Sequence, residues 1–488
     1  DVRYMLGETP ELRHLFVATG FNSIGIQSAG GAGKVLAEWI VEGHASMDLG
    51  DVDIRRMQPF QNTRAYLAER AKESLGLLYA MHWPYRQYET ARGARTSPLH
   101  ERLAARGACF GEAAGWERPN WFASKGIEPR YAYSYGRQNW FEHAAAEHGA
   151  VRQRVALFDM TSFGKFLVQG RDAEAALQRI CANDVAVAPG RIVYTQWLNA
   201  RGGIEADLTV TRLGETSFMV VTAAAAARRD LAWLNRHIDG DRHVVATDIG
   251  SGIAVLSLMG PQSRALLERV SGADLSNAAH PFGASRQIDI GYARLRAARI
   301  TYVGELGYEL YVPTEFARNV FDAIMAAGAP YGLRLAGMHA MDSCRIEKAY
   351  RHWGHDIGDE DTPIEAGLMF AVKLDKGLDF IGREALLRQR DLGSDKRLVQ
   401  FLLEDPTPLL YHDEPIWRDG LMVGRTTSGA YGHHLGGAVA LGYVRHGKEP
   451  AADFVAQGRF EIEVANVRFK ARASLAPLYD PRNERIRA

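Results

Sequence analysis

Cysteine is scarce in this sequence. Among 488 residues there are three cysteines, Cys109, Cys181 and Cys344, and they lie far apart. This spacing excludes a disulfide framework and the clustered ligands of a zinc site, and it indicates a reducing compartment. We therefore expect no metal site, and a cytoplasmic location or, for a eukaryotic source, the mitochondrial matrix.

The sequence also lacks an excess of one charge and a long apolar run. Lys and Arg together number 58, as do Asp and Glu, which argues against a nucleic acid or a membrane surface as partner. The longest apolar stretches, "GIAVLSLMG" and "FMVVTAAAAA", reach about half of the roughly 20 residues that a membrane helix needs. No signal-peptide pattern opens the chain, which begins at Asp1, and we expect a portion of a longer protein.

The pattern of the remaining chain predicts an α+β fold in several units, because the length alone suggests roughly three domains. Helical and strand-like runs interleave between residues 102 and 395, without regular strand–helix repeats. Residues 396–488 are rich in short alternating strands with Gly and Asp turns, which predicts a small β-barrel. Residues 1–45 are too few to form a core of their own, and 46–101 look like a connecting module.

A glycine-rich stretch near the start, "GFNSIGIQSAGGAGK", resembles a phosphate-binding loop but fails the tests for one. Position 28 is Ser28 where a P-loop requires glycine, and Val35 follows Lys34 where a hydroxyl is required. The dinucleotide pattern GxGxxG fails as well, because Leu36 stands at its last position. We therefore interpret the stretch as a strand, a glycine-rich turn and a helix that begins near "KVLAEWIVEG".

Three stretches place polar side chains inside patterns that otherwise look buried. In "YTQWLNARGGIEADLTVTR" an Arg-Gly-Gly turn predicts a hairpin, with Asp207 just after it. In "RITYVGELGYELYVP" two carboxylates, Glu305 and Glu309, lie four apart, with Tyr302 near them. Each acid could be an ordinary turn or edge residue; alternatively, a half-buried carboxylate could bind the N–H groups of a heteroaromatic ring or move a proton.

The third stretch is "MHAMDSCRIEKAYRHWGHDIGDEDTPIEAG". Arg345 lies in a predicted helix, either in a weak ion pair with a nearby acid or holding a carboxylate or ring oxygen of a ligand. His352 and His355 have no helical i,i+4 spacing and precede a solvated acidic run, so we do not interpret them as metal ligands.

These motifs together resemble known families. "YTQWLNARGGIEADLTV", "YVGELGYELYV", "DSCRIEKAYRHWGHDI" and "TTSGAYGHHLGGAVALGYV" resemble the folate-binding T-protein of the glycine cleavage system over roughly residues 130–480. "FVATGFNSIGIQSAGGAGKVLAEWIVEG", "ARGARTSPLHERL" and "WERPNWFA" resemble dimethylglycine and sarcosine dehydrogenases, in which a flavin domain precedes such a module. The resemblance implies a flavin-domain tail (1–45), a linker domain (46–101), a folate-binding domain (102–395) and a C-terminal barrel (396–488).

The resemblance also implies a function and a site. The expected function is one-carbon transfer from an N-methyl amine to tetrahydrofolate, giving 5,10-methylenetetrahydrofolate, with FAD as the oxidant in the whole enzyme. The implied catalytic residue is Asp207. The implied folate-binding residues are Tyr194, Asp207, Tyr302, Glu309 and Arg345. The residues implied for one side of an FAD site are Gly20, Asn22, Gly25 and Ile26.

Two other functions stay open at this point. The chain could be a stand-alone aminomethyltransferase, or a non-catalytic folate-binding subunit that docks a separate flavin domain or subunit. Thr222 stands in "MVVTAAA" where T-proteins commonly carry an asparagine, which favours the dehydrogenase branch over a glycine-cleavage role. The dinucleotide fingerprint and most of an amine-oxidising pocket are missing, so the FAD site would be shared with sequence outside this chain.

Overall fold

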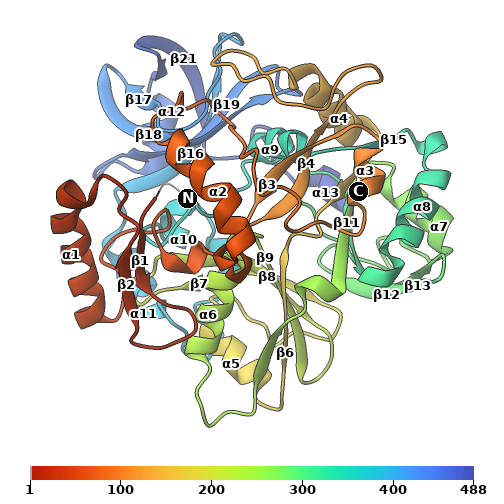
Figure 1. Ribbon diagram of the computed structural model, residues 1–488, viewed down its shortest axis with the longest axis horizontal. Coiled ribbons are helices and arrows are strands. Elements are labelled where there is room, and N and C mark those ends of the chain that lie inside the picture. The colour runs from red at the N-terminus through yellow and green to blue at the C-terminus, as the bar shows by residue number, and fades with distance from the viewer. Residues whose placement is uncertain (1–2) are drawn as a thin grey trace.

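The computed structural model describes residues 3–488 (Figure 1). Its N-terminal part is a two-stranded antiparallel ribbon, covered by one long helix and joined to a second helix. These elements are β1 (Met5–Glu8), β2 (Phe16–Thr19), α1 (Gly25–Glu42) and α2 (Arg64–Leu77). The ribbon and α1 pack closely because Gly7 has φ of +111° and a Cβ there would lie 2.4 Å from the Trp39 ring.

The helix of this part begins earlier than the sequence pattern predicts. Gly30, Gly31 and Gly33 lie inside α1, which starts at Gly25, and no separate glycine-rich turn precedes Lys34. The helix forms despite its glycines because Ala32, Val35 and Trp39 share one buried face, and it ends at Gly43 in the left-handed conformation.

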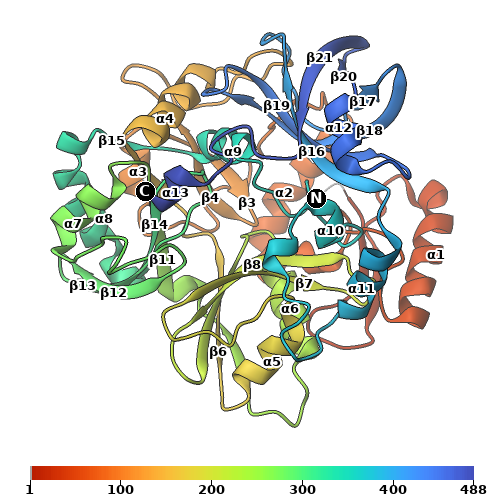
Figure 2. The same cartoon turned by 180° about the vertical axis from the view of Figure 1, so that it is seen from behind.

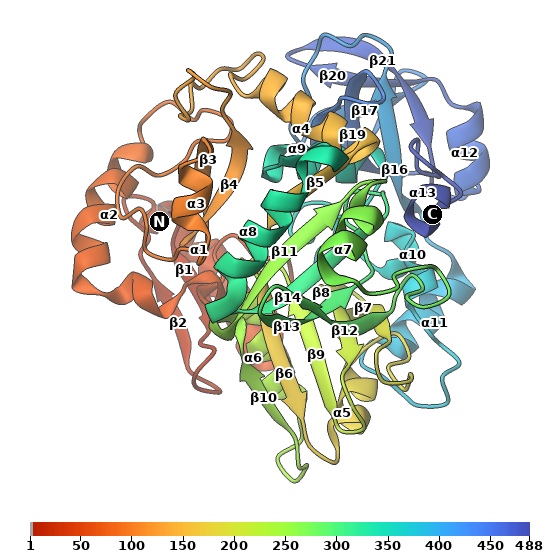
Figure 3. The same ribbon diagram turned by 90° about the vertical axis from the view of Figure 1, so that its right-hand side faces the viewer.

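The central part contains two antiparallel-dominated sheets that pack against each other (Figure 3). The five-stranded sheet has the order β10 (Val245–Asp248), β6 (Gly164–Gln169), β9 (Ser217–Thr222), β8 (Ile204–Arg212) and β7 (Ile192–Leu198). The six-stranded sheet has the order β12 (Ser285–Ile290), β13 (Ala293–Ala298), β14 (Gly307–Pro313), β11 (Ile253–Met259), β5 (Val155–Asp159) and β15 (Leu333–Leu335). Only β15 pairs in parallel, with β5.

Helices and a hairpin cover these sheets. The hairpin is β3 (Ala108–Ala113) with β4 (Trp116–Phe122). The helices are α3 (His100–Ala104), α4 (Phe141–Gln153), α5 (Ala173–Ile180), α6 (Ala227–His237), α7 (Ser263–Ser271), α8 (Ala317–Ala327), α9 (Met338–Glu347), α10 (Pro363–Ala366) and α11 (Arg383–Leu392). Helix α9 contacts α4, β4 and the barrel strand β18, so it lies at the centre of the molecule.

The C-terminal part is a closed six-stranded barrel, as the alternating strand pattern predicts. Around the barrel the strands are β16 (Lys396–Leu403), β19 (Gly437–Arg445), β18 (Leu421–Gly432), β17 (Pro415–Arg418), β20 (Phe460–Val464) and β21 (Val467–Ser474). Helix α12 (Ala451–Gln457) covers it, and α13 (Glu484–Arg487) returns the chain to the six-stranded sheet (Figure 2). There the carbonyl of Ala488 accepts hydrogen bonds from Arg264 and Arg299.

A hydrophobic cluster fills the space between the two sheets and α9. Phe158 and Val255 enter it from the six-stranded sheet, Met219 and Val221 from the five-stranded sheet, and Met341 from α9. Tyr302 and Ile192 pack on its edge. Polar groups that face this cluster must therefore bind one another or a ligand, because burial without a partner costs free energy. Among the described residues, every helix is too short or too polar to cross a lipid bilayer.

Candidate functional site

Asp207 lies within a hairpin strand and faces a partner from the neighbouring strand. Strands β7 and β8 pair through the Arg-Gly-Gly turn, and the register places Gln196 directly opposite Asp207. Gln196 donates from Nε2 to Oδ1 of Asp207 at 2.8 Å. The hydroxyl of Tyr194 also hydrogen-bonds the carboxylate. The aspartate is the fourth residue of β8, a position inside the strand and not in the turn that precedes it.

The surroundings of Asp207 make its carboxyl group easier to protonate than usual. Burial raises the pKa of Asp207 to about 6, although the hydrogen bonds from Gln196 and Tyr194 and the positive charge of Arg351 act in the opposite direction. The side chain is only half-buried, so a ligand can reach it. A carboxyl group with a pKa of about 6 can accept and return a proton near neutral pH.

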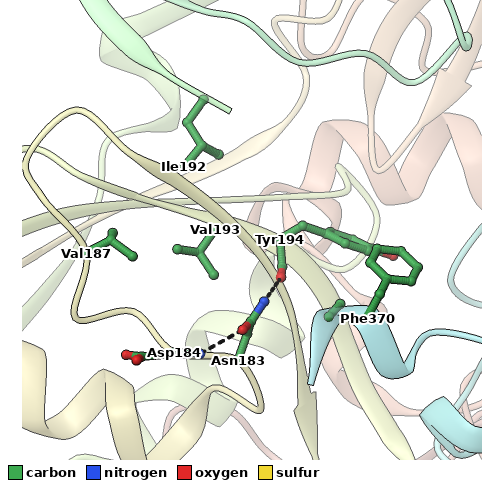
Figure 4. A pocket seen from close by; sticks show the side chains of 8 residues that line it. Asn183, Asp184, Val187, Ile192, Val193, Tyr194 and Phe370 are labelled. Carbon is green, nitrogen blue, oxygen red and sulfur yellow. Dashed lines mark hydrogen bonds between the residues drawn. The ribbon is translucent and has the colours of Figure 1, made fainter. Parts of the chain in front are cut away.

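A cavity of about 280 Å³ opens beside Tyr194 (Figure 4). Its wall includes Asn183, whose Nδ2 donates to the Tyr194 carbonyl at 2.9 Å, and the apolar side chains of Ile192 and Val193. The rings of Tyr194 and Phe370 are stacked with centroids 6.0 Å apart, although Phe370 is 74% exposed. A cavity whose wall combines apolar side chains with Asn183 and Asp184, and which has an accessible aromatic ring at its edge, suits a flat heteroaromatic ligand.

Tyr302, in the loop before β14, lies within electrostatic range of both Asp207 and Arg345, and Arg345 lies on α9. The charge of Asp207 contributes to the raised pKa of Tyr302, although burial is the main cause, and the Tyr302 hydroxyl donates to the Arg351 carbonyl at 2.8 Å. Arg345 is buried and donates from Nη1 to Asp356 at 2.6 Å and from Nε to Asp342 at 3.2 Å. Arg345 therefore forms the predicted ion pair with a nearby acid, and it forms a second ion pair with another acid.

The barrel holds this arginine in place through a buried carboxylate. Asp356 is fully buried, and its Oδ1 accepts hydrogen bonds of 2.6 Å from the hydroxyls of Thr427 and Ser428, both on β18. Burial acts to raise the pKa of Asp356, but Arg345 and these hydroxyls outweigh it and hold the pKa below its ordinary value. Ser428 also accepts from Arg345 at 3.2 Å. The position of Arg345 thus depends on the barrel.

Glu309 lies on β14, with Tyr311 on the same face of the strand. The Tyr311 hydroxyl donates to Oε2 of Glu309 at 2.6 Å, so a protein group satisfies part of the carboxylate. Ser257 stands directly opposite Glu309 on β11, is almost fully buried, and its hydroxyl has no hydrogen-bond partner among the described residues. Burial raises the pKa of Glu309 to about 7. These two polar groups face one side of the sheet and leave capacity for a ligand.

Glu305 does not join Glu309, although the two acids lie only four residues apart in the sequence. The residues around Glu305 form a loop before β14. This loop sends the side chain to Arg152, at 3.3 Å, and to the hydroxyl of Tyr479. Two carboxylates four residues apart share a face only when one regular strand carries both, and here β14 begins at Gly307.

The four residues expected to bind FAD lie around the start of α1. Gly20 has φ of +78°, Asn22 is exposed, Gly25 is the first residue of the helix, and Ile26 is 99% exposed. No side chain caps this helix start. Free backbone N–H groups at a helix N-terminus can donate hydrogen bonds to the polar edge of a flavin ring. These four residues fit such a contact, and they form only one wall of an FAD site.

Several residues of this region carry no signal in the sequence. Gln196 looks like an ordinary strand residue, and only the pairing of β7 with β8 shows that it holds Asp207. Its Oε1 is buried and has no hydrogen-bond partner among residues 3–488. Arg351, Ser257 and Phe370 likewise reach the site through tertiary contacts. Knowledge of the strand register would have identified Gln196 and Ser257.

Family comparisons agree with the architecture. The model described as "GCVT N-terminal domain" matches residues 99–376. "Glycine cleavage T-protein C-terminal barrel domain" matches 396–480, and "FAD dependent oxidoreductase central domain" matches 42–97. The chain belongs to the glycine cleavage T-protein family. The expected α+β fold class, with a folate-domain-like unit before a barrel, is confirmed, whereas the expected unit boundaries at 45, 101 and 395 stay predictions.

Longer relatives of this T-protein family member cover the whole chain. A 4-methylaminobutanoate oxidase (formaldehyde-forming) of Paenarthrobacter nicotinovorans is 47% identical over 100% of the chain and 58% of that protein. The pyruvate dehydrogenase phosphatase regulatory subunit, mitochondrial, of Mus musculus is 37% identical over 98% of the chain and 56% of that protein. Human mitochondrial sarcosine dehydrogenase is 37% identical over 100% of the chain and 57% of that protein.

The resemblance to the dehydrogenase branch is therefore confirmed, and the T-protein family member spans somewhat more than half the length of these relatives. Among solved structures, the glycine cleavage system aminomethyltransferase T of Bartonella henselae superposes with a TM-score of 0.66. It is 26% identical and covers 79% of this chain and 98% of its own. The chain thus contains nearly a whole aminomethyltransferase-like unit, with additional residues before it.

Proposed function

We propose that this chain is the folate-binding, one-carbon-transferring half of an FAD-dependent enzyme that demethylates N-methyl amino acids. The observation that carries the proposal is the half-buried Asp207, which is held by Gln196 and by Tyr194, a residue of the wall of the 280 Å³ cavity. Tyr302, Glu309 and Arg345 contribute hydroxyl, carboxylate and guanidinium groups around the same two-sheet interior. The names of two relatives, an oxidase of a methylamino acid and sarcosine dehydrogenase, support the amine class.

The chemistry needs one group that accepts a proton and later returns it. A methylene iminium, CH₂=NHR⁺, combines with the N5–H and N10–H of tetrahydrofolate to give 5,10-methylenetetrahydrofolate and RNH₃⁺. Two C–N bonds form, the C–N bond of the iminium breaks, and both N–H protons end on the departing amine. Asp207 takes a proton from a folate nitrogen and returns it to that amine, which its raised pKa of about 6 favours.

Neighbouring residues orient the folate and keep water away. The unpartnered Oε1 of Gln196 and the hydroxyl of Ser257 offer hydrogen-bonding positions inside an otherwise apolar space. Tyr194 and Phe370 provide aromatic faces at the cavity edge. Arg345, fixed by Asp356, presents a permanent positive charge toward ring oxygens. FAD, when bound between the wall around Gly20 to Ile26 and sequence outside this chain, would supply the hydride acceptor for the amine.

A second function is favoured by one relative. The pyruvate dehydrogenase phosphatase regulatory subunit shares the fold over nearly the whole chain. The same architecture is therefore compatible with a non-catalytic folate-binding or regulatory subunit that docks on a partner. We propose a flavin domain or subunit, the amine and folate as partners, and the cytoplasm or the mitochondrial matrix as the location. Which of these apply depends on which of the two functions is correct.

Binding of a stable reduced folate tests the site. Titration of the chain with 5-formyltetrahydrofolate, followed by tryptophan fluorescence, should give saturable binding that Asp207→Ala and Glu309→Ala each weaken at least about tenfold, the loss of one charge-assisted hydrogen bond. Asp289→Ala is the matched control, because Asp289 is a strand carboxylate with 61% of its side chain exposed, in a surface ion pair with Arg294. Affinity like that of the wild type in both site variants would contradict the site assignment.

Turnover separates the two functions. Formaldehyde and tetrahydrofolate condense to 5,10-methylenetetrahydrofolate and water, so formaldehyde can replace the iminium as carbon donor. The proposed enzyme should accelerate this condensation above the uncatalysed rate, and Asp207→Ala should remove the acceleration. Folate binding without acceleration would favour the regulatory subunit.

A further inference from the structure

A second cavity, of about 260 Å³, opens where the N-terminal ribbon meets helix α6 (Figure 1). Its wall takes residues from the loop between β1 and β2, from a 3₁₀ turn at Ile54–Arg56 and from α6. Among the described residues that line it, none belongs to the cavity at Tyr194 or to the stretch from Gly20 to Ile26. The cavity is therefore separate from the sites that we assign to folate and FAD.

Three arginines and one glutamate carry the charges of this wall. The arginines are Arg13 in the loop, Arg55 in the 3₁₀ turn and Arg236 in α6, and the glutamate is Glu11. Glu11 forms an ion pair with Arg228, near the start of α6. The glutamate therefore has a partner of its own, and it does not neutralise the three guanidinium groups that face the cavity.

Two buried acids behind the wall hold Arg55 and Arg236 in place. Asp53 accepts hydrogen bonds from Nε of Arg55 at 2.9 Å and from its Nη2 at 2.5 Å, and only 5% of the aspartate side chain is exposed. Glu8, whose side chain is 6% exposed, accepts from Nη2 of Arg236 and, at 2.7 Å, from the backbone N–H of His14. Guanidinium groups that are fixed in this way lose little conformational freedom when a ligand binds.

Each of the three guanidinium groups keeps donors that no protein group uses. Nη1 of Arg55, and Nε and Nη1 of Arg236, make no hydrogen bond with any residue from 3 to 488, and these atoms are not sealed in the interior. Arg13 donates through Nη2 to the carbonyl of Arg236 at 3.2 Å, and its Nε and Nη1 are likewise unused within the described part of the chain. A ligand with oxygen acceptors would satisfy these donors.

The balance of charge at this cavity favours an anion. The charged groups that line the cavity, or that pair with those lining it, are Arg13, Arg55, Arg228, Arg236, Glu8, Glu11 and Asp53. Arg13 is the member of this set that has no acid as its partner among the described residues. The carbonyl end of α6 lies beside the cavity and would repel an anion, but Arg13 offsets this effect because it binds a carbonyl of that last turn.

We propose that this cavity binds a small molecule through an oxyanion group, a carboxylate or a phosphate, which Arg13 of the loop and Arg236 of α6 hold together. A guanidinium group binds either oxyanion with two parallel hydrogen bonds, and Arg55 offers a further donor. The volume lies just below the range of about 300–1,000 Å³ that is typical of ligand sites, which suits a small metabolite.

The bound anion would also strengthen a junction between two parts of the molecule. Arg13 belongs to the N-terminal part and Arg236 to a helix that covers the five-stranded sheet. The ion pairs of Glu8 with Arg236 and of Glu11 with Arg228 already cross this junction. An oxyanion that contacts both Arg13 and Arg236 adds one more link across it, whatever reaction the rest of the chain performs.

Isothermal calorimetry of the full chain tests the site, with succinate and inorganic phosphate as probes and sodium chloride to hold the ionic strength constant. We expect saturable binding of at least one probe at millimolar concentration. The unfolding temperature should rise with the concentration of that probe, because a ligand that binds only the folded state stabilises it by mass action. The probe that binds more tightly shows whether the oxyanion is a carboxylate or a phosphate.

Substitutions in the wall test which groups hold the anion. Arg13→Gln should weaken the binding at least about tenfold, as the loss of a charged hydrogen-bonded contact predicts. Arg294→Gln is the matched control, because Arg294 is an exposed arginine of β13 outside the cavity wall, and it should bind as the wild type does. Ala232→Glu should abolish binding by placing a carboxylate in the wall, whereas Ala232→Gln, of the same size without the charge, should retain most of it.

The outcomes separate this proposal from the proposed function. Absence of saturable binding of both probes, or binding by Arg13→Gln and Ala232→Glu that equals the wild type, would overturn the anion site even where folate binds normally. Both variants should bind 5-formyltetrahydrofolate within about twofold of the wild type, as expected for independent sites. A parallel loss of folate binding in Ala232→Glu would make the cavity part of the folate site and overturn its separate assignment. Anion binding without folate binding would contradict the folate function instead.

Discussion

The substitution Tyr194→Phe isolates one of the groups that help to keep Asp207 ionised, beside Gln196 and Arg351. The Tyr194 hydroxyl hydrogen-bonds the Asp207 carboxylate and lowers its pKa, which burial has raised to about 6. A hydrogen bond to a charged group contributes about 1.5–3 kcal/mol, and about 1.4 kcal/mol corresponds to one pKa unit. Loss of this bond should therefore raise the pKa of Asp207 by roughly one to two units, while Phe keeps the aromatic wall of the cavity.

The pH dependence of the formaldehyde–tetrahydrofolate condensation is the measurement. Asp207 must be ionised to accept a proton, so the enzymatic rate should rise with pH through about 6 in the wild type. In Tyr194→Phe the same rise should occur near pH 7 to 8. Carbon-13 carboxyl NMR of the free chain, with Asp207→Asn to assign the signal, should report the same change without turnover.

A matched variant tests whether the effect is local. Tyr311→Phe removes an equivalent tyrosine–carboxylate hydrogen bond, of 2.6 Å, from Glu309. It should leave the Asp207 titration where it is in the wild type. An unchanged pH profile in Tyr194→Phe, or an equal change in Tyr311→Phe, would refute the reasoning that Tyr194 tunes Asp207.

Two further predictions concern stability. Glu347→Ala should lower the free energy of unfolding by about 3–5 kcal/mol, because it removes the nearer of the two carboxylates, 2.9 Å away, that pair with the buried Arg152; urea denaturation measures this. Asp230→Asn should gain about 2.6 kcal/mol of stability relative to the wild type between pH 5 and pH 8, because burial raises the pKa of the 1% exposed Asp230 to about 7. The folded state holds this proton more tightly than the unfolded state, so wild-type stability falls as pH rises from about 4 to 7, and an amide has no such dependence.

The control for Glu347→Ala is a partly exposed ion pair at the surface. Glu463→Ala removes a surface ion pair with Arg468 at 3.4 Å and should cost less than about 1 kcal/mol. A similar loss in Glu463→Ala and Glu347→Ala would show that burial does not set the cost. For Asp230, the same stability difference between variant and wild type at both pH values would contradict the raised pKa.

Local patterns predicted the parts of the fold that depend on neighbouring residues. The alternating strands after residue 396 form the barrel, and the Arg-Gly-Gly turn joins β7 and β8 as expected. The predicted start of α1 was wrong. Helix propensity treats glycines as breaks, whereas Trp39 and Val35 give the helix one buried face that outweighs these glycines. Contacts with the ribbon, which no local pattern contains, decide where this helix begins.

The same limit applies to the site. Asp207, Tyr302 and Arg345 are visible in the sequence as polar residues in apolar surroundings, and the fold brings Tyr302 within electrostatic range of the other two. Gln196 is not visible, because its role depends on cross-strand register. Only the folded structure sets this register.

The hydrogen bonds from Thr427 and Ser428 to Asp356 have a consequence for anyone who divides this chain into pieces. Arg345 is anchored by a carboxylate whose hydroxyl donors lie on the other side of residue 395. A fragment that ends before the barrel would keep every side chain that we assign to the folate and lose the scaffold of one of them. Chimeras that exchange barrels between relatives should therefore be judged by the donors at these two positions before any other similarity is considered.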